Sequence, residues 1–191
     1  RGRRREQQQL LRGLGRREGA TPFMVFMAAF NALLCRYSGQ DDICVGFPAT
    51  CRDGDTGDTI GLFVNTLVLR TDLSGNPTFR QLLDRVRDQC RNALANGDLS
   101  FERLVEELQS ERDLSRNPLF QIMFAYQNYA SAHFAVPDMQ ATALELDGAT
   151  AKFDVTLSLT EHGSRVNGFF EYPADLFDRA TIGRMARHFI A

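Results

Sequence analysis

The stretch Ile60–Arg70 reads IGLFVNTLVLR and is apolar on both of its alternating faces. A strand of this kind is usually covered on both sides, so the stretch is predicted to be a central strand of a sheet. Asn65 and Thr66 interrupt the apolar run. A buried amide without hydrogen-bond partners costs about 1–3 kcal/mol. Asn65 is therefore predicted either to hold a neighbouring loop by hydrogen bonds or to line a cavity.

Helical and strand patterns alternate on both sides of this stretch. Thr21 followed by Pro22 is the pair expected at a helix start, and Ser38-Gly39 ends the helix that follows. Pro48 is predicted to stop the next strand, and Asn76-Pro77 to begin the second helix. The other periodic segments predict helices over 101–108, with its apolar side inward, and over 179–191 after an Asp178 cap, and strands over 43–47, 119–127, 139–146, 152–160 and 166–172.

This order of elements predicts an α/β fold, a mixed-sheet sandwich with helices packed on the sheet. The apolar content of 43% and the net charge of -2 are those of an ordinary cytoplasmic protein that binds neither nucleic acid nor membrane. Residues 1–20 form a basic arm in which seven Arg outweigh two Glu. The arm is either a solvated helix face or a contact for an acidic partner.

The side chains that usually build active sites are scattered. The four cysteines form no C-x-x-C pair, and Cys35, Cys44 and Cys90, which lie in apolar patterns, are predicted to be reduced core residues. The three histidines lie far apart with no metal-ligand spacing, so a zinc site is not expected. Neither a phosphate-binding loop nor a nucleophile elbow is present. The sequence therefore predicts no metal and no catalytic residue in this chain.

Six consecutive stretches resemble the C-terminal half of the condensation domain of nonribosomal peptide synthetases, in order and in spacing. They are PFMVFMAAFNALLCRYSGQDDICVGFPATCR, IGLFVNTLVLRTDLSGNPTFRQLL, LSFERLVEEL, RNPLFQIMFAYQN, KFDVTLSL and EYPADLFDRATIGRMARHF. One departure concerns the loop ATCRDGDTGDT, which lacks the family's Glu and carries Cys51, so a role for this loop is not carried over.

The resemblance implies one lobe of a two-lobed fold of the chloramphenicol-acetyltransferase type. In that family, carrier proteins bring two thioesters on phosphopantetheine arms into a tunnel between the lobes, where an amide bond forms. The catalytic motif His-His-x-x-x-Asp-Gly belongs to the first lobe and is absent here. The resemblance thus implies that residues 21–191 are the C-terminal lobe, with 1–20 as the inter-lobe connector. No cofactor is expected to bind this lobe directly.

The resemblance also gives five side chains a possible role. Asn65 and Asp154 would lie in the wall of the substrate tunnel. The alternative for Asn65 is a structural hydrogen bond, and the alternative for Asp154 is plain exposure to solvent. Arg70, Arg112 and Asn117 are expected to be structural or to lie at the lobe interface. Residues 128–150 are the candidate for the family's crossover between lobes.

Three functions remain open at this stage. The first is a fragment of an amide-forming domain. It is expected to be truncated at both ends, because the sequence begins with Arg1 and its last predicted helix still continues at Ala191, and to be inactive alone, because it lacks the histidine motif. Its partners would be peptidyl or aminoacyl carrier proteins, the missing N-terminal lobe and adjacent synthetase domains. The second is a non-catalytic platform on which carrier proteins dock. The third keeps the fold but catalyses epimerisation, cyclisation or ester formation.

Overall fold

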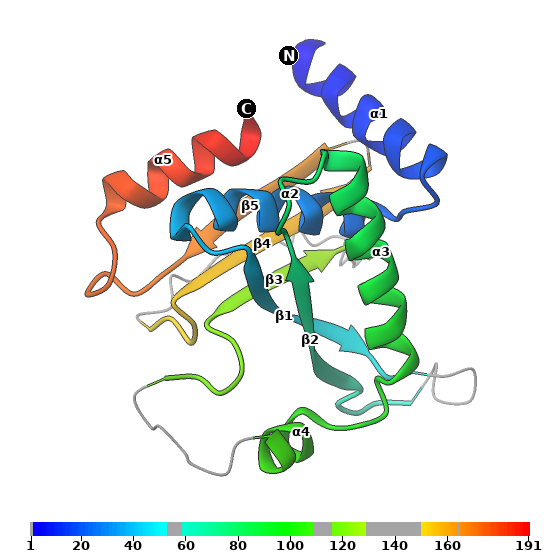
Figure 1. Ribbon diagram of the computed structural model, residues 1–191, viewed down its shortest axis with the longest axis vertical. Helices are drawn as coiled ribbons and strands as arrows, with labels where there is room; N and C mark the ends of the chain where they lie inside the picture. The colour runs from blue at the N-terminus through cyan, green and yellow to red at the C-terminus, as the bar shows by residue number, and fades with distance from the viewer. Residues whose placement is uncertain (1, 53–58, 109–115, 129–149, 164) are drawn as a thin grey trace, which may run out of the picture.

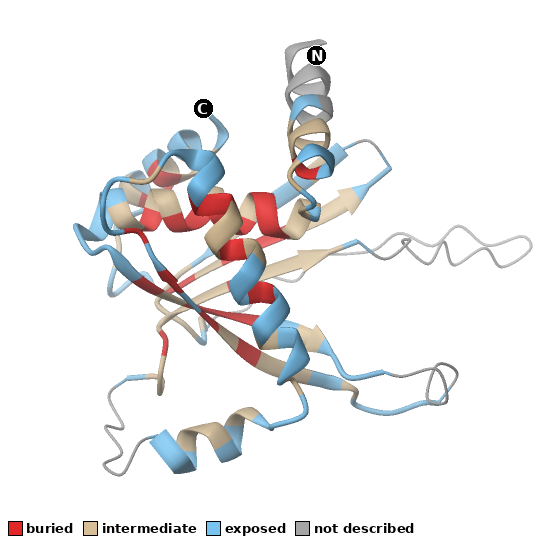
Figure 2. Cartoon of the chain, turned by 45° about the vertical axis from the view of Figure 1, so that its right-hand side comes forward, coloured by how far each residue is buried: buried red, intermediate tan, exposed pale blue. Residues whose placement is uncertain are grey.

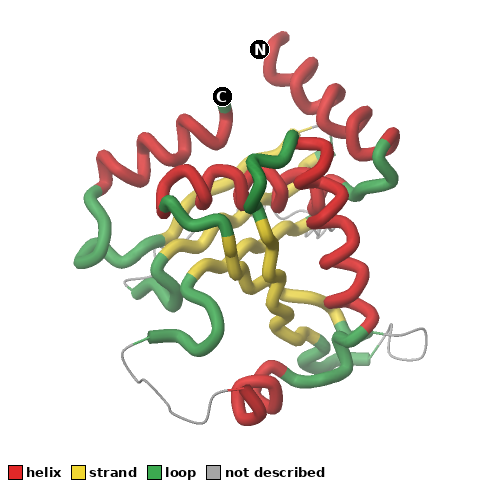
Figure 3. The backbone as a smooth tube through the Cα atoms, in the orientation of Figure 1, coloured by secondary structure: helices red, strands yellow, loops and turns green. Residues whose placement is uncertain are grey.

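The structure is a computed structural model that describes residues 2–52, 59–108, 116–128, 150–163 and 165–191, with side chains from Leu10 onward in the first helix. Helices and strands alternate along the chain, and Figure 3 shows their distribution. The elements are α1 (Gly2–Arg17), α2 (Pro22–Ser38), β1 (Asp42–Thr50), β2 (Val64–Asp72), α3 (Phe79–Ala95), α4 (Phe101–Leu108), β3 (Ile122–Gln127), β4 (Val155–His162), β5 (Arg165–Glu171) and α5 (Arg179–Ile190).

The five described strands form one mixed sheet in the order β2-β1-β3-β4-β5. The outer pairs β1–β2 and β4–β5 are antiparallel, whereas β1–β3 and β3–β4 are parallel. Helices α2, α3 and α5 lie on one face of this sheet (Figure 1). The predicted α/β fold with helices packed on a mixed sheet is confirmed. The predicted strand at 139–146 and the crossover at 128–150 lie almost wholly outside the described residues.

The core fills the space between α2, α3 and the sheet, where Figure 2 shows the buried residues gathered. Phe30 of α2 is fully buried and packs against Phe124 of β3, with ring centroids 6.0 Å apart. Val45 and Phe47 of β1 face the same core, and so do alternate residues of β4. A buried Phe or Leu contributes about 1.5–3 kcal/mol by leaving water, so this layer is what holds the helices on the sheet.

The prediction that Ile60–Arg70 is a central strand is wrong. The strand begins only at Val64, and β2 lies at the edge of the sheet with β1 as its single described neighbour. Leu67, Leu69 and Thr71 face the core, whereas Thr66 and Val68 on the other face are only partly covered by described residues. Ile60 and Leu62 are 101% and 90% exposed. The prediction failed because the second apolar face is present in the sequence but is only partly covered by the described residues.

Proline and positive backbone angles moved several predicted boundaries. β1 continues through Pro48, which lies beyond the single β1–β3 pair at Gly46, so its missing N–H breaks no ladder bond to β3. Asn76 takes a φ of 49°, and α3 begins at Phe79 instead of at the Asn76-Pro77 pair. Leu119 takes a φ of 66°, which delays β3 to Ile122.

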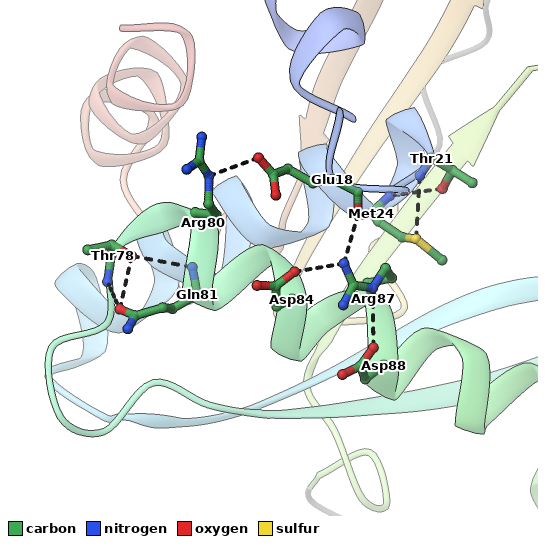
Figure 4. Close-up of polar contacts among 9 residues, drawn as sticks. All are labelled: Glu18, Thr21, Met24, Thr78, Arg80, Gln81, Asp84, Arg87 and Asp88. Carbon is green, nitrogen blue, oxygen red and sulfur yellow. Dashed lines mark hydrogen bonds and ion pairs between the residues drawn. The ribbon is translucent and has the colours of Figure 1, made fainter. Parts of the chain in front are cut away.

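The helix ends mostly follow the predicted chemistry. Thr21 accepts a hydrogen bond from the Met24 N–H at 3.3 Å, and Gly39 closes α2 in the left-handed conformation. For α3 the cap is Thr78, which exchanges hydrogen bonds with Gln81 in a capping box (Figure 4). Asp178 precedes α5 as predicted, but its side chain makes no capping hydrogen bond.

Most of the basic arm is helix α1, and the second half of this helix is attached to the sheet and to α3 rather than merely solvated. Arg12 forms an ion pair with Glu161 of β4, and Glu161 also accepts a hydrogen bond from the hydroxyl group of Tyr126. At the end of α1, Glu18 pairs with Arg80 of α3 at 2.8 Å, and its carbonyl accepts from Arg87 at 2.7 Å (Figure 4). Two separate sets of polar contacts therefore fix the orientation of α1 relative to β4 and α3.

Within the described residues no single helix is long and apolar enough to cross a membrane. Residues Leu10–Arg17 and Pro22–Ser38 meet the length and composition criteria only as a pair, with a bend of 103° between them. The second member is α2, the buried helix of the core.

Candidate functional site

Asn65, the predicted tunnel residue of β2, holds the connection between α3 and α4. Its side-chain N–H₂ group donates to the carbonyls of Gly97 at 2.9 Å and Leu99 at 2.8 Å. Its oxygen accepts from the N–H of Phe101, the first residue of α4, at 3.2 Å. The amide thus uses both of its donors and its acceptor on one backbone segment. These three hydrogen bonds correspond to the first of the two roles predicted from the sequence, in which Asn65 holds a neighbouring loop.

The segment that Asn65 holds positions α4, a short amphipathic helix. Ser100 caps it by accepting from the N–H of Arg103 at 3.3 Å, as predicted. None of its residues is buried, contrary to the inward face that the sequence predicts, and Leu108 is 64% exposed. Phe101, Leu104 and Val105 of its apolar face are half-buried, and the ring of Phe101 lies 5.5 Å from that of Phe120. α4 is therefore a half-covered helix at the sheet edge that β2 forms (Figure 1).

Phe120 connects α4 to the face of the sheet opposite the helices. Its ring stacks on Phe153 at 5.3 Å and is 1% exposed. It lies directly over Gly46 of β1, where an added Cβ would come within 2.2 Å of the ring. Only glycine leaves room for the ring, which explains an apolar strand with a glycine at its centre. The sequence offered Gly46 as a signal, but it could not name the ring that needs the space.

Asp154, the second predicted tunnel residue, lies just before β4. Its backbone N–H donates to the carbonyl of Gln121 at 2.9 Å, which aligns the start of β4 with the start of β3. The register places Asn65 opposite Ala49, near the end of β1, whereas Gln121 lies two residues before the Met123 that pairs with Gly46. The two residues are therefore at opposite ends of the sheet and do not form one cluster.

Of the three residues predicted to be structural or to lie at the lobe interface, the structure describes Arg70 and Asn117, which join different parts of the chain. Arg70 holds Asp42 of β1 through two hydrogen bonds, Nε–Oδ1 at 2.9 Å and Nη2–Oδ2 at 2.7 Å. This pair is exposed, so it stabilises the fold little, although the bond from Arg70 lowers the pKa of the Asp42 carboxyl. Asn117 donates to the carbonyl of Lys152 at 2.7 Å and so joins the segments leading into β3 and β4. Arg112 lies outside the described residues.

The thiols and histidines do not assemble a reactive centre among the described residues. No group of three His, Cys, Asp or Glu side chains there is arranged to hold a metal ion. The four cysteines are all unpaired with one another, and burial raises the pKa of the Cys90 thiol to about 12. A thiol that stays protonated is a poor nucleophile, so Cys90 is a core residue.

The raised pKa of Cys90 predicts a base-dependent loss of stability. An unfolded thiol has a pKa of about 8.5. Because the folded pKa is higher, the stabilising contribution is complete below about pH 8.5 and is lost as the pH rises toward 12. We expect the urea midpoint to fall between about pH 8.5 and 11, and to fall less steeply in Cys90→Ala. The control Cys51→Ala, at an exposed site, should keep the wild-type slope, and three equal slopes would contradict the assignment.

A mixed sheet with helices on one face is an architecture that solved condensation domains share. The condensation domain from Monacolin K polyketide synthase MokA superposes with a TM-score of 0.82 at 23% identity, over 94% of this chain and 42% of that one. The X-domain from teicoplanin biosynthesis superposes with a TM-score of 0.84 at 29% identity, over 94% of this chain and again 42% of that one.

Sequence comparison leads to the same class. The family model described as Condensation domain matches residues 4–191, so the chain belongs to the condensation-domain family. A linear gramicidin synthase of Brevibacillus parabrevis is 50% identical over 182 residues, which are 94% of this chain and 2% of that protein. Malpinin synthetase of Mortierella alpina is 47% identical over 172 residues, 90% of this chain and 2% of that protein. The chain therefore spans a small fraction of these curated relatives.

Proposed function

We propose that this chain is the C-terminal lobe of a condensation domain that joins two carrier-bound aminoacyl or peptidyl thioesters by an amide bond. The single observation that carries the proposal is the uncovered apolar face of β2 and the residues before it. Val64, the first residue of the edge strand β2, is 54% exposed, and Ile60 and Leu62, which precede the strand, are almost fully exposed. Apolar surface of this kind on an unpaired edge marks a contact with another protein surface.

The proposed reaction places the catalytic base in the other lobe. This chain contains no His-His-x-x-x-Asp-Gly motif, and its three histidines are not neighbours in sequence. The proposed contribution of the chain is a wall: α4 and the aromatic cluster of Phe101, Phe120 and Phe153 would border the tunnel on the side away from the core. Asp154 directly follows Phe153 of this cluster and would meet the tunnel beside it.

For Asn65 the hydrogen bonds support a positioning role within this wall. The amide holds the N-terminal end of α4 and would set where the exposed side of that helix meets its partner. Arg70, Arg112 and Asn117 remain candidates for structural or interface roles. Residues 1–20 are proposed as the inter-lobe connector and residues 21–191 as the lobe, because α1 is fixed to β4 and α3 by Arg12 and Glu18.

The partners and carriers follow from the family. We infer that the substrates arrive on the phosphopantetheine arms of carrier proteins, which this lobe would contact without binding a cofactor of its own. The X-domain of teicoplanin biosynthesis forms a complex with OxyB, which supports the general inference that this fold docks other proteins. Action in the cytoplasm, among other synthetase domains, is part of the proposal.

The alternative of a non-catalytic docking platform differs in the upstream polypeptide. A degraded histidine motif in the roughly 180 residues before Arg1, a typical domain length, would favour the platform. The X-domain, with 29% identity, is the comparison that gives this alternative its weight, because its solved complex holds a partner protein. Epimerisation, cyclisation and ester formation stay possible reactions of the same fold.

The exposed apolar edge predicts that the isolated chain associates with itself. We expect sedimentation velocity to show oligomers, and a dye for exposed apolar surface to bind. Addition of the separately expressed upstream lobe should give a 1:1 complex and release most of the dye. The double variant Ile60→Ser, Leu62→Ser should be monomeric with little dye bound, because it removes the two most exposed apolar side chains. A monodisperse wild-type monomer without dye binding would contradict the proposal.

A further inference from the structure

A second uncovered apolar surface lies far from the sheet edge, between the first and last helices. A groove of about 830 Å³ runs between α1 and α5, with α2 and the β4–β5 hairpin as its floor. Figure 1 shows the two helices apart from each other above α2, α1 on the right and α5 on the left, one near each end of the chain. Leu10, Phe169 and Ile190 line it and remain 67%, 56% and 64% exposed. This surface takes no part in the proposed tunnel.

The charged side chains that line the groove are both basic. Arg17 of α1 and Arg179 of α5 line it, and no Asp or Glu does. Neither arginine forms an ion pair within the part of the chain that the structure describes. Helix α5 contains three arginines and no acidic residue, although the whole chain has a net charge of -2. Of the acids next to these arginines in sequence, Glu18 is paired with Arg80, and Asp178 forms no ion pair with Arg179 in the described structure.

The shape and the charges together specify one kind of occupant. Two helices that lie on a common third helix leave a slot in which a further helix can place its apolar side chains at i, i+3, i+4 and i+7. Arginines at the rim favour carboxylates beside that apolar stripe. We propose that the α1–α5 groove docks an amphipathic helix of a partner protein that carries Asp or Glu along both edges of its apolar face. The inference goes beyond the proposed function, because it requires neither the upstream lobe nor amide formation.

The groove can be tested with two model peptides of about 18 residues, roughly five helical turns. Both carry the same leucine stripe at helical spacing, one with Glu and the other with Lys along its edges, and each bears a fluorophore for anisotropy. Two ion pairs at the exposed rim should make the Glu peptide bind this chain about tenfold more tightly than the Lys peptide. The difference should shrink as salt is raised to about 0.5 M, where the screening length falls to a few ångströms.

Two helix glycines provide a matched pair of variants. Gly183 of α5 lines the groove, and a Cβ added there would meet only the flexible Arg187 side chain, at 3.8 Å. Gly13 of α1 also has open space around it but does not line the groove. Gly183→Leu should fill the groove and weaken binding of the Glu peptide at least tenfold, while Gly13→Leu should bind as the wild type does. Both variants replace a helical glycine by a better helix former, so thermal melts should show neither unfolded.

Charge reversal completes the test. In the double variant Arg17→Glu, Arg179→Glu the preference should invert, so that the Lys peptide binds more tightly. Equal affinity of the two peptides for the wild type, or binding unchanged by Gly183→Leu, would overturn the proposal. So would a groove occupied by a second copy, seen as oligomers that Gly183→Leu alone dissociates. Binding to phosphatidylglycerol vesicles that depends on Gly183, without binding of the Glu peptide, would assign the groove to a lipid surface instead.

Discussion

Replacing Asn65 by Asp is expected to destabilise the fold by about 3 kcal/mol at neutral pH. The substitution keeps the shape and the oxygen that accepts from the Phe101 N–H. It removes both donors, however, and places a carboxylate oxygen about 3 Å from the carbonyls of Gly97 and Leu99. An unpaired acceptor there costs about 1–3 kcal/mol, and more when it is charged. Urea unfolding followed by circular dichroism measures the change.

The pH dependence of this variant identifies the cause. Facing two carbonyls, the introduced carboxyl has a folded-state pKa above its unfolded value of about 3.9. Its deficit is therefore full at neutral pH and shrinks as the pH falls through the folded pKa, because the protonated carboxyl can donate to one carbonyl. Asn96→Asp is the matched control: it also loses an amide bond to a carbonyl, but at an exposed site, and should cost less than about 1 kcal/mol. A pH-independent deficit would contradict the hydrogen-bond interpretation.

The same residue separates positioning from direct contact in the intact domain. Asn65→Ala should weaken stability and activity together, since α4 loses the group that holds its first residue. A variant as stable as the wild type but much less active would instead place the Asn65 amide against the substrate.

The second large effect concerns the space above Gly46. Gly46→Ala should cost about 2 kcal/mol, although alanine is a modest change, because its Cβ would fall 2.2 Å from the fully buried Phe120 ring. The ring has little freedom to move, since Phe101 and Phe153 pack against it. Thermal and urea unfolding give the size of the effect.

A double-mutant cycle tests the mechanism. Phe120→Leu alone should cost about 1–2 kcal/mol through lost packing. In the double variant Gly46→Ala, Phe120→Leu the smaller side chain leaves room for the new methyl group, so the total should fall below the sum of the two single effects by at least about 1 kcal/mol. Additive effects would show that the Gly46–Phe120 contact is not the cause.

The sequence predicted the elements whose signals are local. The start of α2 at Thr21-Pro22 and its end at Ser38-Gly39 were both predictable, because capping chemistry depends on a few adjacent residues. The place of β2 in the sheet was not readable. Two apolar faces predict a cover on both sides, but whether the cover lies in the same chain depends on contacts distant in sequence.

The candidate site shows the same limit. Asn65 stood out because a polar residue in an apolar run demands partners, and a loop-holding role was one of the two roles that the sequence predicted. That its partners are Gly97, Leu99 and Phe101 was not predictable, since 32 to 36 residues separate them from Asn65. The basic arm was predicted from its charge excess, but Leu11 and Leu14 were the unused signal for its packing against the core.

Amide formation measures the central claim most directly. The chain alone, the upstream lobe alone and the two joined in one polypeptide would each be given a donor and an acceptor thioester on carrier proteins, with product followed by mass spectrometry. The proposed function predicts product only from the joined polypeptide, and none when the histidines of the upstream motif are replaced by alanine. Product formed by the 191-residue chain alone, or a joined polypeptide that binds both carriers and forms none, would contradict it.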